Sequence, residues 1–154
     1  SASSSAYGNA SKMPITETDP VNPISPYAVQ KHVGEIYCKM FSKIYDLNTI
    51  SLRYFNVFGE RQVVEGAYAL VIGVFSKQLL EGKPMTIRGD GNQRRDFTYV
   101  GDVVEANVLA LNSDLVGAGE VINIGTGLNY SINDIADILG GERVYIDPVV
   151  EPFA

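Results

Sequence analysis

Residues 25–31 are Ser-Pro-Tyr-Ala-Val-Gln-Lys, and they open a long stretch with helical periodicity. The leading serine suits the N-cap, and the proline after it suits the first helical position. Apolar side chains then recur at helical spacing to about Asp46. The stretch predicts one helix, with Tyr27 and Lys31 on the same face because they are four residues apart.

The Tyr27–Lys31 spacing places a phenol beside an ammonium group. A free phenol is a poor base near neutral pH. A cation about 4 Å away favours its ionised form by on the order of 4 kcal/mol at an effective dielectric constant of about 20. A tyrosine paired in this way can remove a proton from a hydroxyl. On these two residues alone, a half-buried tyrosine beside a solvated lysine remains the alternative.

Three further blocks flank this pair in a fixed order: Ser3-Ser4-Ser5-Ala6-Tyr7-Gly8, Leu52-Arg53-Tyr54-Phe55-Asn56-Val57-Phe58-Gly59, and the segment from Gly89 to Val100. With the tyrosine–lysine pair, they resemble the extended short-chain dehydrogenases/reductases, within the NAD-dependent epimerase/dehydratase family. The resemblance is to the C-terminal half of UDP-glucose and UDP-N-acetylglucosamine 4-epimerases. It implies an α/β fold, in which the C-terminal half of a Rossmann-like parallel sheet is interleaved with a small substrate-binding lobe.

The resemblance assigns roles by position. Tyr27 corresponds to the catalytic base, and Lys31 to its partner, which also binds the nicotinamide ribose. Ser3 occupies the place of the hydroxyl that contacts the reacting sugar oxygen; Ser4 is the alternative for a register shift of one, and Ser5 belongs to the same substrate-binding block. A frayed, low-complexity terminus is the other interpretation of these serines.

Further substrate and cofactor contacts are implied downstream. Phe55 corresponds to a residue that lines the nicotinamide site. Asn56 corresponds to an amide near the substrate diphosphate, although it could simply cap a turn. Arg95 corresponds to the diphosphate-binding arginine, since a guanidinium suits paired oxygens. Strand alternation would put Arg94 on the other face, so at most one of the two arginines should face the site. Asp102 is acidic, but its spacing to a following glutamate indicates a helix start.

No dinucleotide-binding fingerprint G-x-G-x-x-G occurs in these 154 residues. In Rossmann folds that loop follows the first strand and binds the pyrophosphate. We therefore expect most of the NAD site upstream of residue 1, and we expect this chain alone to be inactive. The end at Ala154 also suggests a truncated segment, because the family places another diphosphate-binding arginine near this point.

Composition favours a soluble globular protein: 45% of residues are hydrophobic and 19% are charged. A net charge of −6 argues against nonspecific nucleic-acid binding. Without a signal peptide or a long apolar run, we expect a cytoplasmic protein that is not bound to membranes. The single cysteine, Cys38, is expected to be a buried thiol, and the single histidine, His32, a solvated helix residue. No metal-ligand cluster is apparent.

Helix and strand patterns alternate, which indicates a parallel sheet. Strands are expected at 49–55, 85–88, 95–100, 121–124 and 143–146, a loop at 56–67, and further helices at 68–81, 102–112 and from a Ser131 cap to Leu139. The family arrangement would assign residues 1–64 and 96–125 to the NAD-binding domain. It would assign residues 65–95 and 126–154 to the substrate lobe.

The implied reaction is 4-epimerisation of a nucleotide sugar, either UDP-glucose/UDP-galactose or a UDP-N-acetylhexosamine, by transient hydride transfer to bound NAD. Dehydratases and decarboxylases of the same family are the alternative. They commonly carry a carboxylate after the serine or threonine, where this chain has Ser4 and Ser5, and a hydroxyl is no carboxylic acid near pH 7. This difference favours an epimerase.

Two functions of other classes remain open for this chain. The helix at 25–46 matches the one that forms the family's homodimer interface, so the chain could be a noncatalytic, self-associating fragment. A compact reductase of small ketones is the third class. The distance in sequence from Ser3 to Tyr27 argues against it, because those enzymes hold the serine much nearer the tyrosine.

Overall fold

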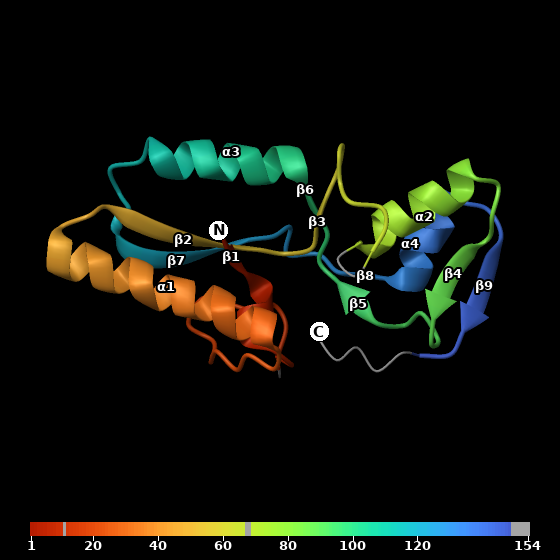
Figure 1. The fold of residues 1–154 in the computed structure, drawn as a ribbon, viewed down its shortest axis with the longest axis horizontal. Helices are drawn as coiled ribbons and strands as arrows, with labels where there is room; N and C mark the ends of the chain where they lie inside the picture. The colour runs from red at the N-terminus through yellow and green to blue at the C-terminus, as the bar shows by residue number, and fades with distance from the viewer. Residues whose placement is uncertain (11, 67–68, 149–154) are drawn as a thin grey trace. The chain divides into compact units, whose positions relative to one another are not determined.

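The computed structural model describes residues 1–10, 12–66 and 69–148. The chain divides into two compact units (Figure 1). Unit 1 contains Ser1–Phe55 and Gly101–Gly125; unit 2 contains Asn56–Val100 and the described residues from Thr126 onward. The first two boundaries therefore fall after residues 55 and 100, whereas the sequence analysis placed them after residues 64 and 95. Each unit is described separately below.

Unit 1 is built on a three-stranded parallel sheet in the order β1-β2-β7. Its strands are β1 (Ala2–Ser3), β2 (Thr49–Tyr54) and β7 (Ala118–Ile124). A 3-10 helix, η1 (Ser4–Tyr7), follows β1 directly. Helices α1 (Pro26–Tyr45) and α3 (Val100–Leu111) lie on opposite faces of this sheet (Figure 1). The unit is thus a three-layer arrangement, and its parallel sheet between helices agrees with the α/β fold that the sequence predicted.

Helix α1 begins where the sequence predicted. The Ser25 hydroxyl accepts a hydrogen bond from the Ala28 amide at 3.1 Å, and Pro26 is the first helical residue. The helix ends at Asp46, whose φ of 53° is left-handed and stops the helical repeat. The hydroxyl of Thr49, at the start of β2, then donates to the Cys38 carbonyl at 2.8 Å and ties the strand back to the helix.

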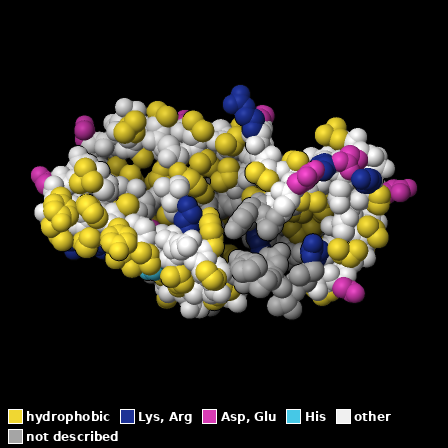
Figure 2. All heavy atoms as spheres, viewed as in Figure 1, with side chains coloured by type: hydrophobic (Ala, Val, Ile, Leu, Met, Phe, Trp, Pro, Cys, Tyr) yellow, Lys and Arg dark blue, Asp and Glu magenta, His cyan; other side chains and the backbone are white. Residues whose placement is uncertain are grey.

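The side chains of α1 are distributed opposite to the usual pattern of a core-facing helix. Its least exposed positions form one stripe of small or polar residues: Ala28, Lys31, His32, Glu35, Cys38 and Ser42. Its large apolar residues are exposed: Val29, Val33, Ile36, Tyr37, Met40, Phe41, Ile44 and Tyr45. Figure 2 shows hydrophobic side chains gathered over this helix.

Small residues on the inner stripe let α1 approach the sheet closely. A Cβ on Gly119, in β7, would lie 2.6 Å from the Cα of Lys39, so only glycine fits there. The Ser42 hydroxyl donates to the Gly117 carbonyl at 3.0 Å. Close backbone approach therefore explains why bulky apolar side chains are absent from this face of α1.

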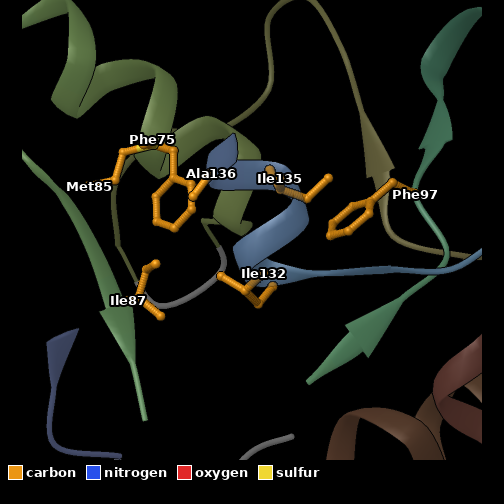
Figure 3. Close-up of a cluster of buried hydrophobic side chains, with 7 residues drawn as sticks. All are labelled: Phe75, Met85, Ile87, Phe97, Ile132, Ile135 and Ala136. Carbon is orange, nitrogen blue, oxygen red and sulfur yellow. The ribbon is translucent and has the colours of Figure 1, made fainter. Parts of the chain in front are cut away.

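In its described residues, unit 2 has three strand pairs and two helices. The short parallel pair is β3 (Val57–Phe58) with β6 (Thr98–Tyr99), the longer parallel pair is β4 (Met85–Arg88) with β9 (Arg143–Ile146), and the antiparallel pair is β5 (Arg94–Arg95) with β8 (Tyr130–Ser131). The helices are α2 (Val71–Leu80) and α4 (Ile132–Leu139). Buried side chains from these two helices, from β4 and from the segment between β5 and β6 form the core cluster in Figure 3: Phe75, Met85, Ile87, Phe97, Ile132, Ile135 and Ala136.

Several sequence predictions are confirmed in unit 2. β4 and β9 have the predicted bounds. The Ser131 hydroxyl accepts from the Asp134 amide at 3.0 Å while the Asp134 carboxylate accepts from the Ser131 amide at 2.8 Å, so the predicted capping box starts α4. Helix α2 begins at Val71, after the predicted start at Tyr68, which lies outside the described residues.

Four predicted elements need correction. The strand expected at 95–100 is two short strands, β5 and β6, each paired with a different partner. Alternation fails between them, and the adjacent Phe97 and Thr98 are both buried. The loop expected at 56–67 contains β3, and β7 starts at Ala118, before the predicted residue 121. Helix α3 begins at Val100 and has Asp102 in its first turn, where a carboxylate favours the helix dipole.

Candidate functional site

The predicted catalytic pair lies at the start of α1. Lys31 Nζ is 5.8 Å from the centroid of the Tyr27 ring. Tyr27 is 43% exposed, and its hydroxyl has no hydrogen-bond partner among the residues that the structure describes. The phenol is therefore accessible beside an ammonium group.

Lys31 connects α1 to the start of the chain. Its Nζ donates to the carbonyl and the hydroxyl of Ser1, both at 3.3 Å. It therefore contacts Ser1, immediately before β1. These two bonds hold the ammonium group beside the serine-rich segment.

The serine-rich segment is folded as β1 and η1, so the alternative of a frayed terminus is wrong. The Ser3 hydroxyl caps η1: it accepts from the Ser5 amide at 3.2 Å and from the Ser5 hydroxyl at 2.9 Å. Ser3, Ser4 and Ser5 are all partly exposed. Ser3 thus has a structural task in addition to the substrate contact predicted for it.

Phe55 packs in unit 1 against the end of η1. Its ring centroid is 6.4 Å from that of Tyr7, which is 2% exposed. The Tyr7 hydroxyl donates to Asn123 Oδ1, in β7, at 2.7 Å. Phe55, predicted to line the cofactor site, therefore packs against the Tyr7 ring, and a hydrogen bond to Asn123 holds that ring in place.

A buried ion pair that the sequence analysis missed lies beneath α1. Arg53 donates from Nε to Glu35 Oε1 and from Nη2 to Glu35 Oε2, both at 2.7 Å. The two residues are 3% and 4% exposed. The guanidinium carbon lies 4.5 Å from the centroid of the Tyr7 ring, within the range of a cation–π contact. Helix α1, strand β2 and η1 thus meet at one guanidinium group.

His32 belongs to the same network. Its Nδ1 lies 2.9 Å from Glu35 Oε2, and its side chain is 29% exposed. The expectation of a solvated histidine is therefore wrong, because Glu35 holds the ring against the sheet side of α1. Cys38, one turn further on, is partly rather than fully buried.

The charge states of the pair follow from these contacts. Burial raises the pKa of Glu35, but hydrogen bonds to Arg53 and His32 outweigh it, so the pKa of this carboxyl lies below its ordinary value. Burial likewise lowers the pKa of Arg53, and its contacts with Glu35 and Tyr7 reverse this, so the pKa of the guanidinium is raised. Both groups are therefore charged near pH 7.

In unit 2, Asn56 has a structural task as well. Its φ is 21°, and its Nδ2 donates to the Asp96 carbonyl at 2.8 Å. The Asp96 carboxylate accepts from the Thr126 amide and hydroxyl and from the Gly127 amide. The amide predicted to contact substrate therefore fastens the segment before β3 to the loop between β5 and β6.

The two adjacent arginines differ in their partners. Arg94 donates to the side chain and the carbonyl of Asn129, and its Nη2 lies 3.4 Å from Asp134 Oδ2. Arg95 donates only to the neighbouring Arg94 carbonyl, at 2.9 Å, among the described residues. Of the two, Arg95 is thus the arginine whose guanidinium has fewer partners among the described residues.

A model described as the NAD dependent epimerase/dehydratase family matches residues 1–125 of the chain. The chain belongs to this family. Within the described residues, none of the helices has the length and apolar character needed to cross a bilayer.

Relatives within this family share the fold over nearly the whole chain. A UDP-glucose 4-epimerase of Mycolicibacterium smegmatis is 40% identical over 141 residues, which cover 92% of this chain and 44% of that protein. The solved UDP-N-acetylglucosamine 4-epimerase of Methanobrevibacter ruminantium, in complex with UDP-N-acetylmuramic acid, is 40% identical with a TM-score of 0.90, covering 97% of this chain and 49% of that one.

A third relative carries both substrate and cofactor. The UDP-glucuronic acid 4-epimerase of Bacillus cereus, solved with UDP-glucuronic acid and NAD, is 38% identical with a TM-score of 0.82. It is covered over 48% of its length, and this chain over 99%. The chain therefore spans about half the length of the relatives it matches.

The ion pair predicts a pH-dependent stability. Glu35→Gln should lower the free energy of unfolding at pH 7 by about 3 kcal/mol, because Arg53 would keep a buried, unmatched charge. Since the pKa of Glu35 is lowered on folding, its contribution is present above the unfolded pKa of about 4.3 and is lost as the pH falls through the lower folded value. The gap between variant and parent should therefore close in acid, as measured by urea unfolding across this range.

The control is Glu105→Gln, which removes the same charge from an exposed site on α3. It should change the unfolding free energy by no more than about 0.5 kcal/mol. Equal effects of the two substitutions at pH 7, or a gap for Glu35→Gln that widens in acid, would contradict this account.

Proposed function

We propose that this chain supplies the proton-transfer pair and part of the substrate site of a UDP-sugar 4-epimerase. The observation that carries the proposal is the accessible Tyr27 phenol beside Lys31. The Lys31 ammonium group also donates hydrogen bonds to Ser1. The activities named for the relatives support the choice of reaction. UDP-glucose and UDP-N-acetylglucosamine are the first substrates to test.

In this mechanism, Tyr27 accepts the proton of the sugar 4-hydroxyl and later returns it. Lys31 places its ammonium group beside the phenol ring. A hydroxyl of the serine block, Ser3 or its neighbours Ser4 and Ser5, holds the reacting oxygen. Because one base serves both proton transfers, forward and reverse epimerisation depend on the same phenol.

The residues present fit part of a nicotinamide cofactor site. Tyr27 and Lys31 offer an exposed hydroxyl and ammonium group to a ribose, and Phe55 offers a ring supported by Tyr7. NAD, when bound, supplies the redox chemistry at carbon 4 of the sugar. This chain's own residues orient the ribose and move the proton.

In this proposal, Arg95 and Asn56 bind the substrate diphosphate. Arg95 is suited to this role because its guanidinium is exposed and donates only to the Arg94 carbonyl among the described residues. A planar guanidinium binds paired phosphate oxygens well. Asn56 would add a hydrogen bond from an amide whose position is fixed by Asp96.

The serine block distinguishes an epimerase from a dehydratase or decarboxylase of the same family. Those reactions need an additional acid or base next to the sugar. Ser4 and Ser5 are hydroxyls, and the Ser5 hydroxyl is engaged with Ser3. Neither can replace a carboxylic acid near neutral pH.

The base assignment predicts a large kinetic effect. Tyr27→Phe in the full-length gene product should lower the turnover number of 4-epimerisation by about 10²–10⁴-fold, because the general base is lost. UDP-sugar affinity should remain near that of the parent, since binding rests on other groups. The measurement is product analysis with UDP-glucose and UDP-N-acetylglucosamine, together with calorimetric binding.

Tyr145→Phe is the matched control, because it removes a hydroxyl from an exposed tyrosine of β9 outside the proposed site. It should leave turnover unchanged. A fully active Tyr27→Phe variant would overturn the assignment of the base. A 4-keto-6-deoxy sugar or carbon dioxide as the product would overturn the epimerase assignment.

We further propose that these 154 residues alone are inactive and bind NAD weakly. The sequence has no G-x-G-x-x-G loop, which supplies the pyrophosphate contacts in Rossmann folds. Calorimetry with NAD on the folded 154-residue chain should give no saturable signal at micromolar concentrations. Tight binding, or measurable epimerisation by this chain, would contradict the proposal.

The exposed apolar side of α1 supports a homodimer through this helix. Eight large apolar side chains there are exposed, far more than a solvated face needs.

Ile36→Lys, at the middle of this side, should convert a dimer to a monomer in light-scattering measurements. Val104→Lys, on the exposed side of α3, is the control and should leave the dimer intact. A monomeric parent protein, or a dimeric Ile36→Lys variant, would exclude this interface.

A further inference from the structure

The buried ion pair of Glu35 and Arg53 lies on the same helix face as the proposed catalytic pair. Tyr27, Lys31 and Glu35 follow each other at intervals of four residues, so they form one row along α1. Lys31 is one turn from the ion pair, and Tyr27 is two turns from it. A shift of Glu35 would therefore rotate or slide the whole row.

Arg53 also lies next to the serine block, residues 3–5. It is the register partner of Ala2, and its neighbour Tyr54 is the partner of Ser3. Its guanidinium also lies against Tyr7, at the end of η1, which carries Ser4 and Ser5. One side chain thus contacts the helix of the base and the segment of the serine hydroxyls.

The two-point attachment restricts the motion of α1. A bidentate carboxylate–guanidinium pair fixes orientation as well as distance, because both oxygens meet separate N–H groups in one plane. The other inner residues of α1 are small or polar, so apolar packing alone would hold the helix loosely in register along the sheet. Close approach at Gly119 sets the spacing, and the ion pair sets the position along the strand.

We propose that Arg53 and Glu35 are positioning residues for catalysis, which hold Tyr27 and Lys31 in register with the serine block. The proposal rests on the proposed epimerase function of the same site. Neither residue needs to touch substrate or cofactor. Their effect is on the geometry of proton transfer, where a displacement of about 1 Å can cost about 10²-fold in rate.

The test compares Arg53→Met and Arg53→Lys in the full-length gene product. Arg53→Met keeps an unbranched side chain but is shorter and loses both hydrogen bonds; Arg53→Lys keeps the charge and can keep one bond. The turnover number should fall about 10²-fold for methionine, and lysine should recover about tenfold of that loss. KM for the UDP-sugar should change less than about threefold, because the ion pair does not bind it.

Two controls separate positioning from a general loss of stability. Arg143→Lys alters another arginine–carboxylate pair, with Asp137 in unit 2, and should leave turnover unchanged. In a Tyr27→Phe background, Arg53→Met should add little further loss, because residues that act through one group are not additive. Full additivity, or an unchanged turnover number for a folded Arg53→Met variant, would overturn the proposal.

Amide hydrogen exchange gives a readout that does not depend on activity. Arg53→Met should speed exchange in the first three turns of α1 more than in α3 of the same unit. Uniformly faster exchange throughout unit 1 would mean a purely structural role and would overturn the proposal. An inactive parent protein would instead refute the epimerase function, while the exchange pattern would still decide whether the ion pair fixes α1.

Discussion

The placement of α1 on its sheet depends on one buried ion pair, Glu35 with Arg53. Burial of two charges is costly, and such a pair often adds little net stability compared with apolar residues of the same volume. Its value here is directional, because a bidentate pair has one good geometry. The bonds from Lys31 to Ser1 and the contact of Arg53 with Tyr7 extend this constraint to the serine block.

The close approach of α1 to the sheet explains why its large apolar side chains point outward. Where Gly119 and Ser42 bring α1 close to the sheet, there is no room for a bulky apolar side chain between them. Its inner stripe is therefore small or polar, and its affinity for the sheet comes from hydrogen bonds. The large apolar residues point outward, where we propose a homodimer interface, so a single helix combines a proposed catalytic face with a proposed interface.

Local patterns predicted much of this fold. The Ser25 cap, the Pro26 start and the Ser131 capping box are short-range signals, and the structure confirms them. The prediction of one strand from 95 to 100 was wrong because its two halves pair with different strands that are distant in sequence. Sequence periodicity carries no information about such pairing. The Glu35–Arg53 pair and the role of His32 were missed for a similar reason. A charged residue on a helix is usually solvated. Arg53 comes next to Glu35 only when β2 packs against α1 in the folded chain.

A double-mutant cycle between Glu35 and Arg53 tests the central claim most directly. The unfolding free energies of the parent, Glu35→Leu, Arg53→Met and the double variant give the coupling between the two side chains. If the pair holds α1 on β2, each single variant is strongly destabilised, the double variant recovers much of the loss, and the coupling is on the order of 2 kcal/mol or more. Additive effects within about 0.5 kcal/mol would show that the two side chains act independently, and would contradict the account.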